Sequence, residues 1–362
     1  MDPFSSFPHD NDTAFPPSSN NGVFSWNGDW PSEPPYNIAH ISPTMKMVSL
    51  VIYSITLLLG AIGNGLVIFL TGFHMKKTVT TIWYLNLAVA DFIFAICLSS
   101  EIAYVALDYH WTLGRLMCKL DTVVPFLNMF ASVFFLTAIS ADRCASVVHP
   151  VWALNHRTLR LASFVAVFIW VVALALSSPY FIFRDTEQSM NGTIQCIYNF
   201  GLEEDGGLRT HRSMVLTEFV IGFLVPFNVI LACYCAIIIK LRKKIFGRFG
   251  RSFKIIVAVV AAFFCCWFPY HLFSILEMLE DNSLEMQTTL DIGLPLANGL
   301  LCLNSCLNPI LYVFIGSDCR KASWQSLLSA FKGAVSEKWA TTLSFSSNRT
   351  SSSTSGMESC MV

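Results

Sequence analysis

The chain has 362 residues, of which 54% are hydrophobic and 13% are charged, and its mean hydropathy is +0.55. Because charged residues make up about a quarter of an ordinary soluble domain, this composition excludes a water-soluble globular protein and indicates one that lies in lipid. Thirty Phe and nine Trp suit helices that contact acyl chains and carry aromatic anchors at their ends. The net charge of −1 gives no indication of nucleic-acid binding, and no nucleic-acid partner is expected.

Seven apolar stretches are each long enough to cross a bilayer, which takes about 20 largely apolar helical residues. The third and fifth contain polar residues throughout, so hydropathy supports them less strongly than the first or the fourth. The chain is therefore expected to be an all-α membrane protein, a seven-transmembrane helix bundle over residues 46–316. The predicted spans are residues 48–73, 82–107, 117–147, 161–183, 214–240, 253–279 and 289–315.

Charged residues in the loops predict the orientation of the bundle, because Lys and Arg concentrate on the cytoplasmic side of a membrane. Residues 74–77, 143–160 and 240–254 carry these basic residues. Residues 1–45 hold acidic residues and neither Lys nor Arg, so they are expected to form a disordered extracellular tail. The chain is expected to be a multi-pass protein of the plasma membrane, with its N-terminus outside and its C-terminus in the cytoplasm.

Two segments follow the seventh span. Residues 317–332 predict a short amphipathic eighth helix on the membrane lipids, and Cys319 is a candidate palmitoylation site beside it. Residues 333–362 are rich in Ser and Thr and offer no apolar core, so they predict a disordered cytoplasmic tail. Phosphorylation would give such a tail clustered negative charge that a partner protein could bind.

Two of the twelve cysteines differ from those inside the spans, which are expected to be small buried apolar residues. Cys118 and Cys196 both lie at predicted extracellular ends, where oxidising conditions would let them form a disulfide. Asn11 and Asn191 begin glycosylation sequons on the same side of the membrane. Asn348 begins a third, but it falls in the predicted cytoplasmic tail and is expected to be unused.

Polar residues inside the spans are costly and therefore point to function. Asp91 lies in the second span, and polar residues of the third and seventh spans could converge on it. Carboxylate, amide and hydroxyl oxygens suit a hard cation, so one interpretation is a sodium ion bound at Asp91; no other cofactor is expected. The alternative is a set of hydrogen bonds that only joins helices. The candidate partners are Asn128, Ser132, Asn304, Ser305 and Asn308.

Asp142 and Arg143 are adjacent at the predicted cytoplasmic end of the third span. An exposed pair of this kind would contribute little. The interpretation favoured here is a switch, in which Asp142 holds Arg143 aside until a helix movement releases it toward Tyr234, Tyr312 and a partner protein. Residues 249–253, at the start of the sixth span, offer no carboxylate for Arg143. Asp142 is therefore expected to hold the resting state.

Two prolines are predicted to bend spans. Pro269 in the sixth span and Pro309 in the seventh each remove a backbone hydrogen bond. Trp267 is expected to point into the bundle just below the first bend. Each residue alone has an ordinary structural explanation, and together with Arg143 they are the expected activation switch.

These motifs stand in a fixed order along the seven spans. They are Gly63-Asn64, residues 87–91, Trp111 near Cys118, Asp142-Arg143, Trp170, Pro226, Trp267-Phe268-Pro269 and residues 308–312. In this order they resemble the rhodopsin-like, or class A, G-protein-coupled receptors over residues 45–332. Asp142-Arg143-Cys144 and residues 150–158, 183–186 and 304–309 resemble the chemoattractant branch, which holds chemerin, formyl-peptide and second prostaglandin D2 receptors. Residues 75–79, 108–111 and 269–271 are most similar to chemerin receptors.

The resemblance implies a receptor for a peptide or small protein, signalling through an inhibitory heterotrimeric G protein, receptor kinases and arrestin. A lipid-mediator receptor and a non-signalling scavenging receptor remain open alternatives. An enzyme is not expected, because no Gly-x-Ser-x-Gly or His-Glu-x-x-His motif occurs. A retinal protein is not expected either, because residues 291–316 contain no lysine. The repeated halves of a transporter are not seen.

The chain departs from its branch where a ligand would bind. Chemoattractant relatives place Lys or Arg eight residues before the proline of the fifth span, and this chain has Glu218 there. Glu101 is a second acidic residue in the outer half of the bundle. Either carboxylate could be structural, but a ligand-facing pair would favour a cationic ligand group. The predicted ligand contacts are Glu101, Glu218, Trp267, Tyr270 and His271, with Asp121, Glu277 and Glu280 near the mouth.

Overall fold

The computed structural model describes residues 43–189, 192–200, 204–242, 251–279 and 284–315. Within these residues, seven helical segments are long and apolar enough to cross a membrane, which confirms the predicted seven-transmembrane bundle. The helices are α1 (Pro43–Phe69), η2 (Leu70–His74), α2 (Val79–Ala106), α3 (Gly114–Val148), α4 (Pro150–His156), α5 (Leu159–Phe183), α6 (Glu204–Thr217), η3 (Glu218–Leu224), α7 (Val225–Arg242), α8 (Arg251–Met278) and α9 (Leu284–Ile315), of which η2 and η3 are π-helices.

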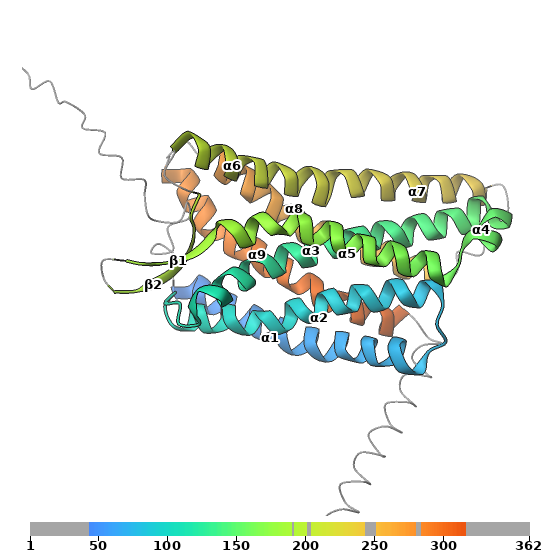
Figure 1. Ribbon diagram of the computed structural model, residues 1–362, viewed down its shortest axis with the longest axis horizontal. Helices are drawn as coiled ribbons and strands as arrows, with labels where there is room; N and C mark the ends of the chain where they lie inside the picture. Colours follow the sequence, from blue (N-terminus) through green and yellow to red (C-terminus); the bar gives the residue numbers. More distant parts are fainter. Residues whose placement is uncertain (1–42, 190–191, 201–203, 243–250, 280–283, 316–362) are drawn as a thin grey trace, which may run out of the picture.

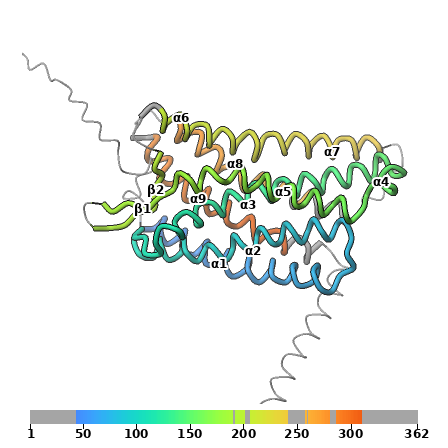
Figure 2. Tube along the Cα trace, in the orientation of Figure 1, coloured from blue at the N-terminus to red at the C-terminus, as the bar shows by residue number. Residues whose placement is uncertain are grey.

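The long helices run side by side along one axis of the molecule (Figure 1). A strand pair lies at one end, which we call the hairpin end, and α4 lies at the other, which we call the α4 end (Figure 2). The fifth span is a continuous run of α6, η3 and α7. Its π-helix directly precedes the turn that holds Pro226, whose missing N–H loosens the helical bonding there.

Two local elements were not predicted from the sequence. After α5 the chain forms an antiparallel hairpin of β1 (Arg184–Gln188) and β2 (Ile194–Tyr198), so the fold is not purely α-helical. The loop after α3 contains α4, which begins at Pro150, since proline is favoured at a first helical position. Hydropathy missed both elements because it detects only segments that cross lipid.

Several predictions fall outside the described residues. They are the eighth helix at 317–332, the tails at 1–42 and 333–362, the modification sites Asn11, Asn191 and Cys319, and Glu280. The backbone of Tyr312 belongs to α9, but its side chain is also outside the described part.

The core of the bundle is built around α3. In its most apolar stretch 56% of the residues are buried, against 17% in the corresponding stretch of α1. Large side chains from several helices meet there, among them Trp83, Phe130, Phe135 and Trp267. The Trp170 indole of α5 donates a hydrogen bond to the Asn86 side chain of α2 at 2.9 Å, which joins α5 to α2 beside this core. Because α3 makes little contact with lipid, it tolerates the polar residues that weakened its prediction as a span.

The hairpin is fastened to α3 by a disulfide between Cys118 and Cys196, as predicted, with their Cα atoms 5.7 Å apart. The backbone N–H of Trp111 donates to Ile194 of β2 at 2.8 Å. Arg115 donates to the Asp185 carboxylate at 2.6 Å. This hydrogen bond lowers the pKa of Asp185, so the contact stabilises the hairpin above the ordinary aspartate pKa and is lost as the pH falls.

We predict that Cys118→Ser and Cys196→Ser each lower the unfolding temperature of the purified protein, through a loss of about 2–4 kcal/mol. The double variant should be no less stable than either single one, because both changes remove the same bond. Cys235→Ser is the control, because Cys235 is an exposed free thiol on α7, and it should leave the unfolding temperature unchanged. Additive losses in the double variant would contradict a mutual disulfide.

Candidate functional site

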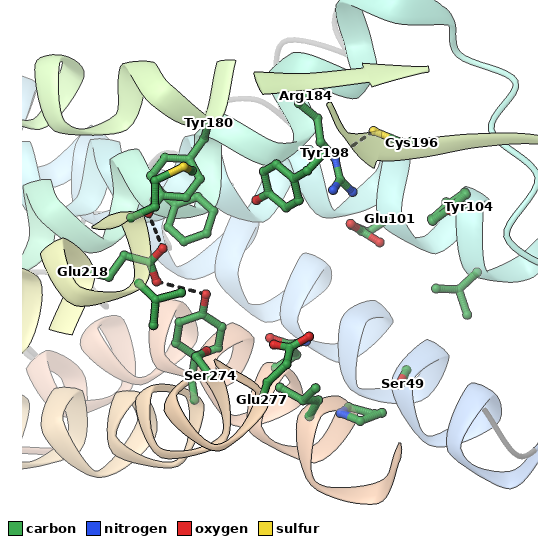
Figure 3. Close-up of a pocket in the computed structure, with 18 of the residues that line it drawn as sticks. Ser49, Glu101, Tyr104, Tyr180, Arg184, Cys196, Tyr198, Glu218, Ser274 and Glu277 are labelled. Atoms are coloured by element: carbon green, nitrogen blue, oxygen red, sulfur yellow. Dashed lines mark hydrogen bonds between the residues drawn. The ribbon is translucent and has the colours of Figure 1, made fainter. Parts of the chain in front are cut away.

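A cavity of about 330 Å³ lies at the hairpin end of the bundle, between the helices and β2 (Figure 3). This volume is large enough for one end of a peptide or for a small molecule. Three carboxylates and one guanidinium line the cavity, from Glu101, Glu218, Glu277 and Arg184. Six tyrosines complete much of the polar wall, namely Tyr53, Tyr104, Tyr109, Tyr180, Tyr198 and Tyr270.

Glu218 is the first residue of η3 and only 3% exposed. One carboxylate oxygen accepts a hydrogen bond from the Tyr180 hydroxyl of α5, and the other accepts one from the Tyr270 hydroxyl of α8 at 3.2 Å. The dashed lines in Figure 3 mark both bonds. No ion pair in the described part of the chain includes Glu218. Glu218 is therefore a buried carboxylate on the cavity wall whose partners, among the described residues, are hydroxyl donors.

The tyrosines that bind Glu218 are themselves packed against aromatic rings. Tyr180 stacks on Phe126 of α3 with ring centroids 3.6 Å apart. Tyr270 meets Trp267 edge-on at 5.9 Å. Trp267 is 1% exposed, and neither it nor the equally buried His271 belongs to the cavity lining. Of the predicted ligand contacts, Glu101, Glu218 and Tyr270 line the cavity, whereas Trp267 and His271 lie in the packed layer behind it.

Glu101 lies on a different wall of the cavity, on α2. Its carboxyl group lies beside that of Asp121 on α3. Ser100 donates a further hydrogen bond to Asp121. Asp121 does not line the cavity. Part of the acidic cluster expected at the mouth is thus turned toward the contact between α2 and α3.

Arg184, the first residue of β1, brings the one guanidinium of the cavity wall. Its guanidinium lies over the Tyr198 ring, 4.5 Å from the centroid, and its Nε donates to Cys196 at 3.2 Å. Figure 3 shows Arg184, Tyr198 and Glu101 on the same side of the cavity. Burial raises the pKa of Tyr198 and of Tyr109 to about 12, so both phenols remain protonated near neutral pH.

The polar cluster around Asp91 forms deeper in the bundle. Asp91 is fully buried, and its Oδ2 accepts from the Asn308 amide at 2.7 Å. The side chains of Asn128 and Ser305 also approach the carboxylate, although Oδ1 has no hydrogen-bond partner of good geometry among the described residues. The structure thus brings α2, α3 and α9 together at one buried carboxylate.

The remaining predicted members of this cluster lie at its edge. The Ser132 hydroxyl donates to Asn128 at 3.2 Å, and Asn128 donates to Ser305 at 3.2 Å. Asn304 is buried on α9, but no hydrogen bond joins it to Asp91 within the described part of the chain. An oxygen-rich group of this kind fits a sodium ion in its donor chemistry.

The prediction that Asp142 pairs with Arg143 is wrong for this structure. The Asp142 carboxylate instead accepts two hydrogen bonds from Arg157, at 2.8 and 3.0 Å. Arg157 also donates to Thr80 at the start of α2, at 2.8 Å. The reason is geometric, because consecutive residues of a helix do not face each other, whereas α4 returns the chain so that Arg157 reaches Asp142.

The other switch residues lie at the α4 end or at the bends. Arg143 is half-buried on α3 near Tyr234 of α7, whose hydroxyl lies close to Ser140. Pro269 is inside α8 and Pro309 is inside α9, as expected. A Cβ atom on Gly63 would lie 2.9 Å from Pro309, so this glycine lets α1 approach the bend in α9.

Sequence reasoning missed Tyr180, Arg184 and Tyr198 as cavity residues and Arg157 as the partner of Asp142. Tyr180 lies in an apolar span, Arg157 follows α4, Arg184 begins β1 and Tyr198 ends β2. No local pattern marks them. Each becomes part of a site only because a distant segment is folded beside it.

The sequence was compared with known proteins. The family model described as 7 transmembrane receptor (rhodopsin family) matches residues 63–312. This chain belongs to the rhodopsin family of seven-transmembrane receptors. Chemerin-like receptor 1 of Homo sapiens is 45% identical over 305 residues, which cover 81% of each chain. The C3a anaphylatoxin chemotactic receptor of Danio rerio is 43% identical over 297 residues, covering 82% of this chain and 80% of the relative.

Chemerin-like receptor 2 of Homo sapiens is 46% identical over 269 residues, covering 74% of this chain and 76% of the relative. The chain is therefore a chemoattractant-type class A receptor, similar to the chemerin-like and C3a receptors, and not an enzyme. As a member of this family it is a multi-pass protein of the plasma membrane, with an extracellular ligand and a G protein as partners.

Proposed function

We propose that this receptor binds a peptide or small protein that inserts a positively charged group into the cavity, and that it then activates an inhibitory G protein and recruits arrestin. The observation that carries this proposal is Glu218, a buried carboxylate on the cavity wall whose described hydrogen bonds come from uncharged hydroxyls. A buried charge is costly without a countercharge. A ligand ammonium or guanidinium would supply it as a charge-assisted hydrogen bond.

The charge balance of the cavity supports the same ligand chemistry. Three carboxylates and one guanidinium line it, and the guanidinium of Arg184 already lies on the Tyr198 ring. The resulting negative field attracts a cation and repels an anionic lipid. The similarity to chemerin-like receptors favours a peptide or small protein over a lipid mediator.

The proposed orientation places the hairpin end outside the cell and the α4 end in the cytoplasm. The Cys118–Cys196 disulfide at the hairpin end suits an oxidising compartment. The basic residues of the loops concentrate at the opposite end, which suits the cytoplasm. In this orientation receptor kinases and arrestin would act on the Ser- and Thr-rich tail, and membrane lipids would cover the exposed apolar faces of the bundle.

We predict that Glu218→Gln reduces agonist potency by about tenfold, because it removes one charge-assisted hydrogen bond worth about 1.5–3 kcal/mol. Chemerin and C3a, the ligands in the names of the relatives, would be tested first, followed by a library of basic peptides. G-protein activation and arrestin recruitment would both be measured, which separates a signalling receptor from a scavenging one. Thr217→Val is the control, because Thr217 is exposed beside Glu218 and bonds only within its own helix.

Two results would contradict the cationic-ligand proposal. One is an agonist whose potency is unchanged in Glu218→Gln and does not fall with added salt, which screens charge attraction. The other is a Glu218→Lys variant that gains a response to acidic lipids or peptides while Glu218→Gln keeps the native response.

We predict that Arg143→Ala abolishes G-protein activation and leaves surface expression and agonist binding unchanged. Arg143 lies beside Tyr234 toward the α4 end of the bundle, whereas the cavity lies at the hairpin end. Arg160→Ala is the matched control, because Arg160 is an exposed arginine at the same end. Full activation of the Arg143→Ala receptor would show that this residue is not part of the switch.

We propose further that Asp91 binds a sodium ion, with oxygens of Asn128, Ser132 and Ser305 near it. Bound sodium would neutralise the buried carboxylate and hold α2, α3 and α9 together.

We predict that NaCl raises the unfolding temperature of the purified receptor more than KCl at equal ionic strength, and that Asp91→Asn removes this difference. Asp185→Asn should preserve it, because Asp185 lies on the hairpin. Equal effects of the two salts on the wild-type receptor would contradict the sodium site.

A further inference from the structure

Three helical segments that are distant in sequence meet at one carboxylate. Tyr180 comes from α5, Glu218 from η3 and Tyr270 from α8, and each tyrosine donates to a different oxygen of Glu218. We call these three side chains the Tyr180–Glu218–Tyr270 link. A hydrogen bond to a carboxylate is directional and stronger than one between neutral groups. The link therefore fixes how far α8 lies from η3 at the cavity.

The two ends of the link are held differently. Tyr180 stacks on Phe126 of α3, the central helix, at 3.6 Å between centroids. Tyr180 also follows a proline, Pro179, but the stacking on α3 makes this end part of the packed bundle. Tyr270 follows Pro269, where α8 lacks a backbone hydrogen bond and can bend. The hydroxyl of Tyr270 thus binds Glu218 from the flexible point of α8.

Around this hydrogen bond, η3 and α8 touch through aromatic rings. Phe219 and Phe223 of η3 lie 6.0 and 5.0 Å from the His271 ring. Phe223 also meets Phe264 edge-on at 5.1 Å. Contacts between aromatic rings are less directional than a hydrogen bond to a carboxylate, so they allow α8 to shift against η3 more readily than the link does. The link supplies the directional contact that favours one position.

We propose that the Tyr180–Glu218–Tyr270 link holds α8 in its resting position and that a cationic ligand group activates the receptor by displacing the Tyr270 hydroxyl from Glu218. The ligand part rests on the proposed function, whereas the holding of α8 does not. An ammonium or guanidinium outcompetes a phenol for a carboxylate oxygen because it adds the attraction of a full positive charge to the hydrogen bond. With Tyr270 released, α8 pivots at Pro269 and its other end moves away from α3. Glu218 then has two roles: it binds the ligand, and by losing its hydrogen bond to Tyr270 it releases α8.

Tyr270→Phe tests this proposal without any ligand, because it deletes the hydroxyl and keeps the ring beside Trp267. Basal G-protein activation in membranes should rise by about tenfold, the equilibrium shift expected from one hydrogen bond to a charged group. Glu218→Gln should also raise it, and the double variant should add little, because both changes break one link. Tyr180→Phe should raise it less, because the bond from Tyr270 remains. Thr217→Val and Ser178→Ala are controls on exposed hydroxyls that bond within their own helices.

A second measurement tests the link without depending on the proposed G-protein coupling. Hydrogen exchange of the backbone at residues 251–261, the first turns of α8, would be measured in the purified full-length receptor alone. Exchange should rise in Tyr270→Phe and not in the controls. Raised exchange without raised basal activation would support the link and contradict the proposed G-protein coupling. Unchanged exchange together with unchanged basal activation, in a variant that still melts cooperatively, would overturn the link.

Discussion

Hydrocarbon offers no hydrogen-bond partner, so every polar group that enters the membrane must find one inside the bundle. This constraint explains why α3 lies at the centre, since it carries polar side chains along its length and has more than half of its most apolar stretch buried. It also explains why buried carboxylates connect different helices. Asp91 meets Asn308 of α9, and Glu218 meets tyrosines of α5 and α8. The polar contacts therefore join helices that the apolar core also packs together.

The same contacts lie where the helices are weakest. Glu218 begins a π-helix, and Tyr270 follows Pro269, so the backbone bonding is interrupted on both sides of the hydrogen bond that joins them. Trp267 packs against Tyr270 in the layer behind the cavity. The packed rings thus connect the cavity wall to the position of the proline in α8. At the α4 end, Arg157 binds both Asp142 and Thr80 and so connects α3 with α2. This end of the bundle therefore has a separate set of polar contacts between helices.

The seven-helix frame is shared with receptors that are about 45% identical, and differences in ligand must arise from the side chains that line the cavity. Here those side chains include six tyrosines and three carboxylates. Glu218 matters most, because it is buried, lines the cavity and is an acidic residue where the resemblance to the chemoattractant branch leads us to expect a basic one. One substitution at such a position changes both the sign of the local field and the partners available to Tyr180 and Tyr270.

The sequence alone determined the number of spans, the family and the disulfide, because apolar length, motif order and two cysteines at matching ends are all visible along the chain. It also identified Asp91, Glu218 and Pro269, because a charge or a proline inside a span stands out against an apolar background. Only the tertiary structure decided their partners. Asp142 pairs with Arg157 because neighbours on a helix face different directions. Glu218 pairs with Tyr180 and Tyr270 because α5 and α8 pack beside η3, and no local pattern records which faces of distant helices will meet.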